Sequence, residues 1–450
     1  GLTVQEIARN ASNAAQASQG ARSEAITARK VVGDSIAHIE KMSGDIGHAA
    51  ESVTDLAQQV ASIDKVLAVI RRRGPVTRDV IVTVTSLSAA TVNRQVGTLI
   101  DAGLLQERPD LAASGAVGRP RVPVELNHRP FLTLGLHIGA RSISIVATDI
   151  RGHTLDAVET PTPQNDPAAA LPALADTARR YLQRWRTRQV LWVGVAVGGT
   201  VDSATGSVTH PRLGWRAAPV GTVIAERLGL RVSVASHVDA MAAAELVFGW
   251  PRSGAPAATT LYVYARETVG FALTIGGKVH TPARGPGSIA GLPVQRDLNG
   301  QPATLEDAVS DDAVVRAARA AGIVPGATSV AAVTRAARAG DTGAAALLTE
   351  RARILGESVA LLADLLNPDS VVVGGQAFTC YPEGMAEVQD AFARRSTVSG
   401  GQVRATVFGD RVQEAGAGVV SLSALYADPV SAMRRARAMA AAGGRVRFDS

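Results

Sequence analysis

The sequence lacks most of the features that mark disulfide-stabilised, secreted or membrane-spanning proteins. It contains one cysteine, Cys380, in 450 residues, which excludes an internal disulfide and a multi-cysteine zinc site. Aromatic residues make up only 4% of the chain against 46% apolar residues, so its cores must be aliphatic. It has no apolar run of about twenty residues and no recognisable signal peptide. These absences predict a cytoplasmic protein with no membrane contact, long enough for two or three domains.

The charge balance is basic, with a formal net charge of +6. An excess of cations favours a polyanionic partner without identifying it. Three consecutive arginines occupy positions 71–73. A second group lies in residues 428–450, which we expect to form a solvated basic tail: Arg434, Arg435, Arg437, Arg445 and Arg447.

The first 60 residues contain no proline, and a regularly spaced series of apolar residues begins within them and continues to Ile70. Its members follow one another at alternating spacings of four and three: Met42, Ile46, Ala49, Val53, Leu56, Val60, Ile63, Leu67 and Ile70. Such an a/d seam over about four heptads favours a coiled coil over a single surface helix. The sequence of residues 3–59 resembles the signalling helix of methyl-accepting chemotaxis receptors. It begins TVQEIARNASNAAQASQGARSEAITARKVVGDSIAHIEKMSGDI. That resemblance implies that residues 1–61 are a fused dimerising helix, natural or engineered.

Residues 74–120 carry the pattern of a DNA-binding unit. A short helix follows Pro75, a turn lies near Ser86, and a second helix runs from about Ser88 to Ala102. Strand-like residues 104–107 and 122–126 enclose a glycine-rich excursion ending in GRPR. Helix, turn, helix and a two-stranded wing predict a winged helix-turn-helix over residues 62–127, although a helical subdomain that binds protein would share this pattern.

The polar residues of this unit are the candidate DNA contacts. Thr77 and Arg78, at the start of the first motif helix, are expected to touch phosphates. Arg119 and Arg121 in the wing are expected to reach the backbone or a narrow minor groove. Five residues of the second helix are expected to face base edges in the major groove: Ser88, Thr91, Asn93, Arg94 and Gln95.

Beyond a short linker at 127–130, strands and helices alternate. Apolar strands are expected within 131–150 and at 189–197, 232–235, 261–273 and 371–375. Helices are expected at 168–187, 238–248 and 345–366. This order predicts an α/β domain over residues 131–427.

The stretch GVAVGGTVDSATGSVTHPRLGW, residues 194–215, makes the resemblance specific. It resembles the sugar loop of the ROK family, named for repressors, open reading frames and sugar kinases, and the helix-turn-helix ahead of it matches the repressor branch. The resemblance covers residues 63–427 and implies an actin-like, two-lobed, ribonuclease H-like domain. The whole chain is thus expected to be multi-domain.

Against the kinases of that family, the residues for phosphoryl transfer are changed. The catalytic base position carries His237, and the aspartate of the first phosphate loop is replaced by His137. The second phosphate loop carries Glu267, whose carboxylate would repel nucleotide phosphates. These three departures predict that the domain is not an enzyme and uses no cofactor.

The family's zinc ligands are replaced as well, so no metal site is expected. The histidine position is Gly291, and the cysteine positions are Asp297, Asn299 and Thr304. By the same correspondence, Arg212, His237 and Glu306 are the candidate residues for binding a sugar or an anionic effector. For Glu306, capping of the following helix is an equal alternative, and Asp202 is expected to form a turn.

We therefore predict a sequence-specific transcriptional regulator that resembles the repressor branch of this family, while the sequence leaves open whether it acts as a repressor or an activator. It would bind an operator in double-stranded DNA as a homodimer or tetramer, with the degenerate kinase-like domain serving oligomerisation and effector sensing. The alternatives are an active ATP-dependent sugar kinase with an added DNA-binding domain, and a signalling scaffold built on the N-terminal helix.

Overall fold

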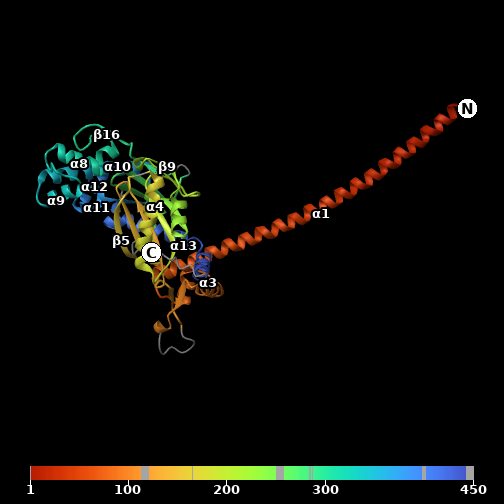
Figure 1. The fold of residues 1–450 in the computed structure, drawn as a ribbon, viewed down its shortest axis with the longest axis horizontal. Coiled ribbons are helices and arrows are strands. Elements are labelled where there is room, and N and C mark those ends of the chain that lie inside the picture. Colours follow the sequence, from red (N-terminus) through yellow and green to blue (C-terminus); the bar gives the residue numbers. More distant parts are fainter. Residues whose placement is uncertain are drawn as a thin grey trace.

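The computed structural model describes residues 2–112, 121–164, 166–249, 258–282, 285, 287–397 and 402–441. Figure 1 shows a two-lobed body with a small helical unit at one end, from which a long helix projects to the N-terminus. Within the described residues, no helix is both long and apolar enough to cross a membrane.

The projecting element is α1 (Leu2–Arg73), a single helix of 72 residues (Figure 1). Along its projecting part, the apolar side chains Ile26, Ile39 and Met42 are exposed. A coiled coil requires a second helix, so that expectation stays a prediction, and the side chains of Ile46, Ala49, Val53 and Leu56 lie outside the described ones. The last turns of α1 are different, because Val66, Leu67 and Ile70 are buried in a core.

Two short helices follow in the expected order. Helix α2 (Arg78–Thr85) ends at Ser86, whose left-handed backbone (φ 56°) makes the turn. Helix α3 (Ala89–Ala102) starts at its N-cap Ser88 and ends at Gly103, where φ is 84°. Strands β1 (Leu105–Glu107) and β2 (Val124–Leu126) pair antiparallel beside them. Together with the end of α1 they form the helical unit, whose core includes Val66, Ile70, Ile81, Val92, Val96 and Leu99.

The first lobe is built on a five-stranded sheet in the order β10-β6-β3-β4-β5. Its strands are β3 (Phe131–Ile138), β4 (Ser142–Thr148), β5 (Thr154–Pro161), β6 (Gln189–Val197) and β10 (Val232–Ser236). Strand β5 was missed in the sequence because its residues are only half-buried and show no apolar run. Helices α4 (Pro167–Leu182) and α5 (Val220–Leu228) cover the sheet, and a small sheet contains β7 (Thr200–Asp202), β8 (Ser207–His210) and β9 (Trp215–Ala218).

The second lobe has a sheet in the order β13-β12-β11-β17-β18, with β14 (Gly287–Ser288) paired to β12. The predicted strand at 261–273 is two antiparallel strands, β11 (Thr259–Ala265) and β12 (Val269–Ile275). The others are β13 (Lys278–His280), β17 (Ser370–Gly374) and β18 (Val403–Ala405). Its helices are α7 (Leu305–Val309), α8 (Asp311–Ala320), α9 (Val330–Arg338), α10 (Thr342–Leu366), α11 (Gln376–Thr379) and α12 (Met385–Arg395).

Helix α13 (Val412–Ala427) returns to the first lobe and packs on β3, β6 and α6 (His237–Phe248). The backbone of α13 comes so close to strands β3 and β6 that each strand needs a glycine at the point of contact. A Cβ on Gly194 would collide with the backbone at Ser421, and one on Gly135 with the backbone at Ala417. These contacts seat α13 firmly against the sheet, since an interior packed to this density leaves no room for an added side chain.

The expected solvated tail proved wrong for residues 429–441. They form α14 (Pro429–Ala441), and Ala432, Met433 and Ala436 are buried in the core of the helical unit. The Arg437 guanidinium donates to the backbone carbonyl of Asp101 near the end of α3. The sequence did not predict this helix because its apolar face is short and lies among three arginines and many alanines. Arg445 and Arg447 lie outside the described residues.

Candidate DNA-binding surface and inter-lobe site

The N-terminal half of α3 is the exposed part of the helical unit that carries the candidate base contacts. The side chains of Asn93 and Arg94 are exposed. Ser88 holds the start of the helix, because its hydroxyl accepts a hydrogen bond from the Thr91 backbone N–H at 3.1 Å. Ser88 and Thr91 therefore also stabilise the helix that presents the two exposed residues.

Gln95 does not face outward, contrary to the sequence prediction. Its side chain is 3% exposed, and its amide donates to the Ser62 hydroxyl of α1 at 2.7 Å. The physical reason is helical geometry: position 95 follows Val92 by three and precedes Leu99 by four, which places it on the buried stripe. Gln95 is thus a structural contact between α1 and α3.

The candidate phosphate contacts lie beside this helix, each engaged with a protein partner. Arg78 donates to Glu107 at 2.8 Å, and Arg121 donates to Asp79 at 2.7 Å. A hydrogen bond from Thr77, assisted by the charge of Arg121, lowers the pKa of Asp79. Surface ion pairs of this kind contribute about 0–1 kcal/mol, so a phosphate can compete for either guanidinium. Arg119 lies outside the described residues.

The arginines at 71–73 do not act as one patch. The Arg71 guanidinium lies over the ring of Tyr426 in α13, 5.1 Å from its centroid, and burial lowers its pKa. The Tyr426 hydroxyl in turn donates to the backbone carbonyl of Ile150. Arg71 therefore ties the helical unit to the first lobe, and only Arg72 and Arg73 are left exposed to a polyanion.

Three histidines gather where the two lobes meet. His137 is the penultimate residue of β3, His237 begins α6 and His210 ends β8. The rings of His137 and His237 are stacked, with centroids 5.8 Å apart and planes 10° from parallel. Within the described residues, each of the three has a buried ring nitrogen that lacks a hydrogen-bond partner. The resemblance had placed His137 and His237 at two positions of the family's kinase site, but it gave no sign that their rings stack or that His210 joins them.

Burial keeps these imidazoles neutral. It lowers the pKa of His237 to about 4, with a smaller effect of His210. It also lowers the pKa of His137, assisted by the neighbouring His237. An efficient general base has a pKa near the working pH, so His237 is a weak substitute for a catalytic carboxylate. Its Nδ1 is buried without a hydrogen-bond partner among the described residues, so no carboxylate orients the ring through that nitrogen.

Ion pairs join the two lobes beside the histidines. Arg212 of the first lobe donates to Glu306 of the second at 2.7 Å, and Asp312 lies 3.9 Å from the same guanidinium. Arg141 in the β3–β4 turn contacts Asp312 and lies 3.9 Å from Glu267. Two of the three candidate effector residues, Arg212 and Glu306, thus pair with each other. Arg141, Asp312 and Glu267 complete a network that no local sequence pattern indicated.

Glu306 does not cap the helix that follows it, and its contact with an effector stays a prediction. Besides pairing with Arg212, it accepts a hydrogen bond from the Val269 backbone N–H at 3.3 Å. Helix α7 is capped instead by Thr304, whose hydroxyl accepts from the Asp307 N–H. Asp202 does form the predicted turn, because its carboxylate accepts from the backbone N–H groups of Ala204 and Thr205.

The loop that corresponds to the family's zinc site is held by hydrogen bonds. The Asp297 carboxylate accepts from the backbone N–H groups of Asn299 at 2.8 Å and Gln301 at 2.9 Å. Strands β15 (Pro293–Val294) and β16 (Ala303–Thr304) pair across the loop. In the part of the chain that the structure describes, no three His, Cys, Asp or Glu side chains are placed to hold a metal ion. The donor set does not fit zinc.

Asp239 is a buried acidic residue that the sequence analysis did not single out. It lies in the first turn of α6 and is 8% exposed, and burial raises the pKa of its carboxyl to about 6. Its position two residues after His237, in the motif that carries the catalytic base, was the available clue. A buried carboxyl with a raised pKa in such a motif is a candidate functional group.

Comparison with known proteins agrees with this architecture. Residues 133–419 match the ROK family. Transcriptional regulator Rv0485 of Mycobacterium tuberculosis is 63% identical over 384 residues, which cover 83% of this chain and 88% of that protein. The DNA-binding transcriptional dual regulator NagC of Escherichia coli is 22% identical over 345 residues, covering 73% of this chain and 84% of NagC.

Among solved structures, the fold is similar to that of a ROK family transcriptional regulator described as a homologue of the Escherichia coli MLC protein. The TM-score is 0.67 at 22% identity, and the match covers 84% of this chain and 98% of that one. A likeness at this identity shows a common fold. With the family match spanning most of both lobes and a relative that is 63% identical, the chain belongs to the ROK family.

Proposed function

We propose that this protein is a sequence-specific DNA-binding transcriptional regulator that acts in the cytoplasm. The helical unit is a winged helix-turn-helix in this proposal, with α3 as recognition helix and β1–β2 as wing. The observation that carries it is the exposure of Asn93 and Arg94 on the N-terminal half of a capped helix. Amide and guanidinium groups are the side-chain types that make bidentate contacts with adenine and guanine. The names of the relatives, a transcriptional regulator and a DNA-binding dual regulator, support it.

Binding as a homodimer or homotetramer fits this geometry. A pair of recognition helices reads a partly palindromic operator when the half-sites lie about one helical turn apart, roughly 34 Å. The exposed apolar side chains on α1, such as Ile39 and Met42, are a candidate dimer seam. The two-lobed domain would serve as the second oligomerisation platform.

The α/β domain is proposed to sense an effector without phosphorylating it. Arg212, His237 and Glu306 are the candidate contacts, together with the buried Asp239. Neutral imidazole nitrogens and a carboxyl close to its pKa suit the hydroxyl groups of a sugar, while the charge of Arg212 is already compensated by Glu306. An effector regulates only if its affinity differs between the DNA-competent and DNA-incompetent states.

The kinase alternative is disfavoured by the same residues. His237 with a pKa of about 4 is a poor base for a sugar hydroxyl. Glu267, which is 12% exposed at the second phosphate loop, places a carboxyl where a nucleotide phosphate would bind. A coupled ADP-release assay with ATP, Mg²⁺ and common hexoses or amino sugars tests this. We expect no sugar-dependent release, and turnover above the sugar-free rate would restore the kinase hypothesis.

The role of α3 is tested by substituting Arg94. Arg94→Ala is expected to weaken binding to the operator by about 1–3 kcal/mol and to scrambled DNA much less, because a base contact is lost. Arg434→Ala, at an exposed position of α14, is the matched control for net charge. Equal losses on operator and scrambled DNA would assign Arg94 to the phosphates instead.

A further inference from the structure

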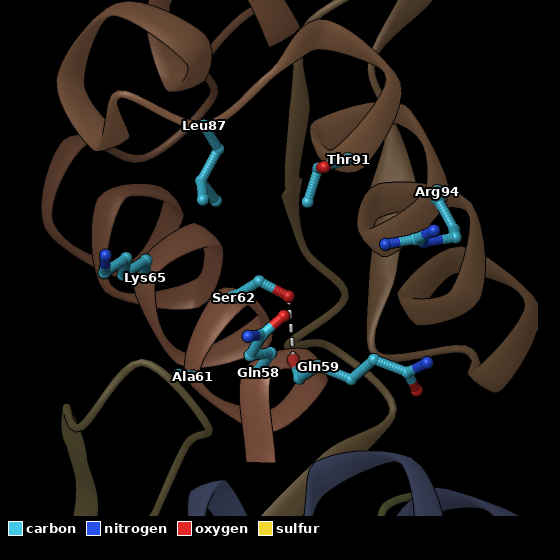
Figure 2. A pocket seen from close by; sticks show the side chains of 8 residues that line it. All are labelled: Gln58, Gln59, Ala61, Ser62, Lys65, Leu87, Thr91 and Arg94. Carbon is cyan, nitrogen blue, oxygen red and sulfur yellow. Dashed lines mark hydrogen bonds between the residues drawn. The ribbon is translucent and has the colours of Figure 1, made fainter. Parts of the chain in front are cut away.

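A groove of about 470 Å³ lies between α1 and the recognition helix α3. Figure 2 shows Lys65 and Arg94 on opposite sides of it, with Leu87 and Thr91 on a third side and Gln58 and Gln59 facing them. Its remaining lining residues are Ala61 and Ser62. The groove adjoins the exposed half of α3, because Thr91 and Arg94 belong to both.

The walls of the groove are fixed relative to each other. The Gln95 amide of α3 donates to the Ser62 hydroxyl of α1 at 2.7 Å, and that hydroxyl donates to the Gln59 carbonyl at 2.8 Å. Both side chains of the first bond are buried. A ligand therefore meets a preformed site and need not order its walls on binding.

The chemistry of the lining suits an anion. Six of the eight lining residues are polar or cationic and none is acidic; the adjoining Asp64 does not line the groove. Within the described residues, neither Lys65 nor Arg94 forms an ion pair, whereas Arg78, Arg108 and Arg121 each do. The uncompensated Lys65 with amide and hydroxyl donors beside it matches the needs of phosphate oxygens, while Arg94 keeps the base contact proposed above.

In a complex with duplex DNA, the anion in this groove would be a phosphate of the DNA backbone. The major groove is about 12 Å wide and a helix with its side chains is about 10–12 Å across, so a phosphate backbone passes along each flank of an inserted helix. One flank of α3 is this groove. A second helix is a poorer occupant, because packing between helices needs apolar knobs and only Ala61 and Leu87 are apolar here.

We propose that the groove between α1 and α3 holds the phosphate backbone on one flank of the bound major groove, with Lys65 as its main cation. The inference rests on the proposed DNA-binding function and extends it to α1. Residues of α1 ahead of the helical unit, Gln58 and Gln59, then belong to the DNA interface.

The test compares full-length Lys65→Ala with Lys41→Ala, since Lys41 is an exposed lysine of α1 that does not line the groove. Fluorescence anisotropy is recorded on operator and scrambled duplexes between about 50 and about 200 mM salt. Losing one phosphate contact is expected to flatten the dependence of log K on log[salt] by about 0.9. Lys65→Ala should weaken binding to both duplexes by the same factor. Lys41→Ala should change neither the affinity nor the salt dependence.

A second variant addresses the groove without removing a lysine. Gln59→Glu places a carboxylate among the proposed phosphate contacts and is expected to weaken both duplexes, whereas Lys41→Glu should have the smaller effect despite its larger change in charge. Thermal melts check the fold of each variant.

Two outcomes overturn the inference while leaving the proposed function intact. In one, the wild type selects its operator but the Lys65 and Gln59 variants keep the wild-type salt slope. In the other, sedimentation shows that these variants lose self-association, and the groove holds a second copy of the chain. If the wild type itself prefers no DNA sequence, the proposed function fails and this inference fails with it.

Discussion

Arg212 and Glu306 come from different lobes and are joined by a hydrogen-bonded ion pair of 2.7 Å. The two side chains are 31% and 23% exposed, so water screens the pair only in part. It joins the two lobes of the domain beside the histidine cluster.

We predict that a double-mutant cycle over Arg212→Ala and Glu306→Ala gives a coupling of about 1 kcal/mol in the free energy of urea unfolding. The coupling should shrink in high salt, because screening weakens the pair. A cycle over Arg212 and Asp307, whose carboxylate instead contacts Thr304, is the control and should give no coupling. Additive effects at Arg212 and Glu306 would mean that the lobes are not held together by this contact.

Acidification should destabilise the fold through His237. Its pKa is about 4 when folded and near 6.5 when unfolded. Its contribution is complete above about pH 6.5 and is lost as the pH falls towards about 4, because the unfolded chain takes up the proton first. Between about pH 7.5 and about pH 5 the loss is about 2 kcal/mol. His237→Gln should reduce the fall in unfolding free energy over this range by that amount.

Asp239 acts in the opposite direction. Its pKa is about 6 when folded and 3.8 when unfolded, so its contribution is present at low pH and is lost as the pH rises through about 6. Asp239→Asn should therefore make the loss of stability on acidification larger, by about 1 kcal/mol at about pH 5. Identical pH profiles for the wild type and both variants would show that neither group titrates as its burial implies.

Helix α14 is predicted to be a structural part of the helical unit. Met433 is fully buried in the core shared with α1, α2 and α3. Met433→Ala should lower the free energy of unfolding by about 2–5 kcal/mol, since it leaves a cavity. The exposed neighbour in Arg434→Ala should stay within about 0.5 kcal/mol of the wild type. A similarly small effect at Met433 would mean that α14 is detached in solution.

Gln95 should matter for stability and not for the choice of sequence. Gln95→Ala breaks the buried bond to Ser62 and is expected to cost about 1–3 kcal/mol in unfolding free energy. Its ratio of operator to scrambled binding should be unchanged at a temperature where it is folded. Asn93→Ala, at an exposed position, should lower the ratio of operator to scrambled binding and leave the unfolding free energy nearly unchanged. A loss of specificity in Gln95→Ala alone would restore its predicted contact with the bases.

The local patterns of the sequence predicted the local structure well. The helix from Ser88 to Gly103 was placed correctly because its N-cap, its apolar stripe and its C-terminal glycine all act within a few residues. The strands and helices predicted for the two lobes are present in the predicted order, but many elements were missed, among them β5, the small sheet of β7, β8 and β9, and helices α5, α8, α9, α12 and α13.

Contacts between distant residues were beyond the reach of those patterns. The pair Arg71–Tyr426 joins the two ends of the described core of the chain, and Arg212 and Glu306 are 94 residues apart. Nothing in the local sequence tells either arginine which distant residue is its partner. Gln95 was misplaced because a polar side chain on a buried stripe looks exposed until its partner on α1 is known. The fold could be predicted, whereas the pairing of polar groups within the site required coordinates.

The central claim is best tested by selecting genomic DNA fragments on the purified protein and titrating the winners by anisotropy against scrambled competitor. We predict a preferred, partly palindromic site that is held at physiological salt and is tighter than the scramble by roughly 10³-fold. Binding that is uniform across sequences and collapses as salt rises would contradict the account and leave a basic protein with the shape of a regulator.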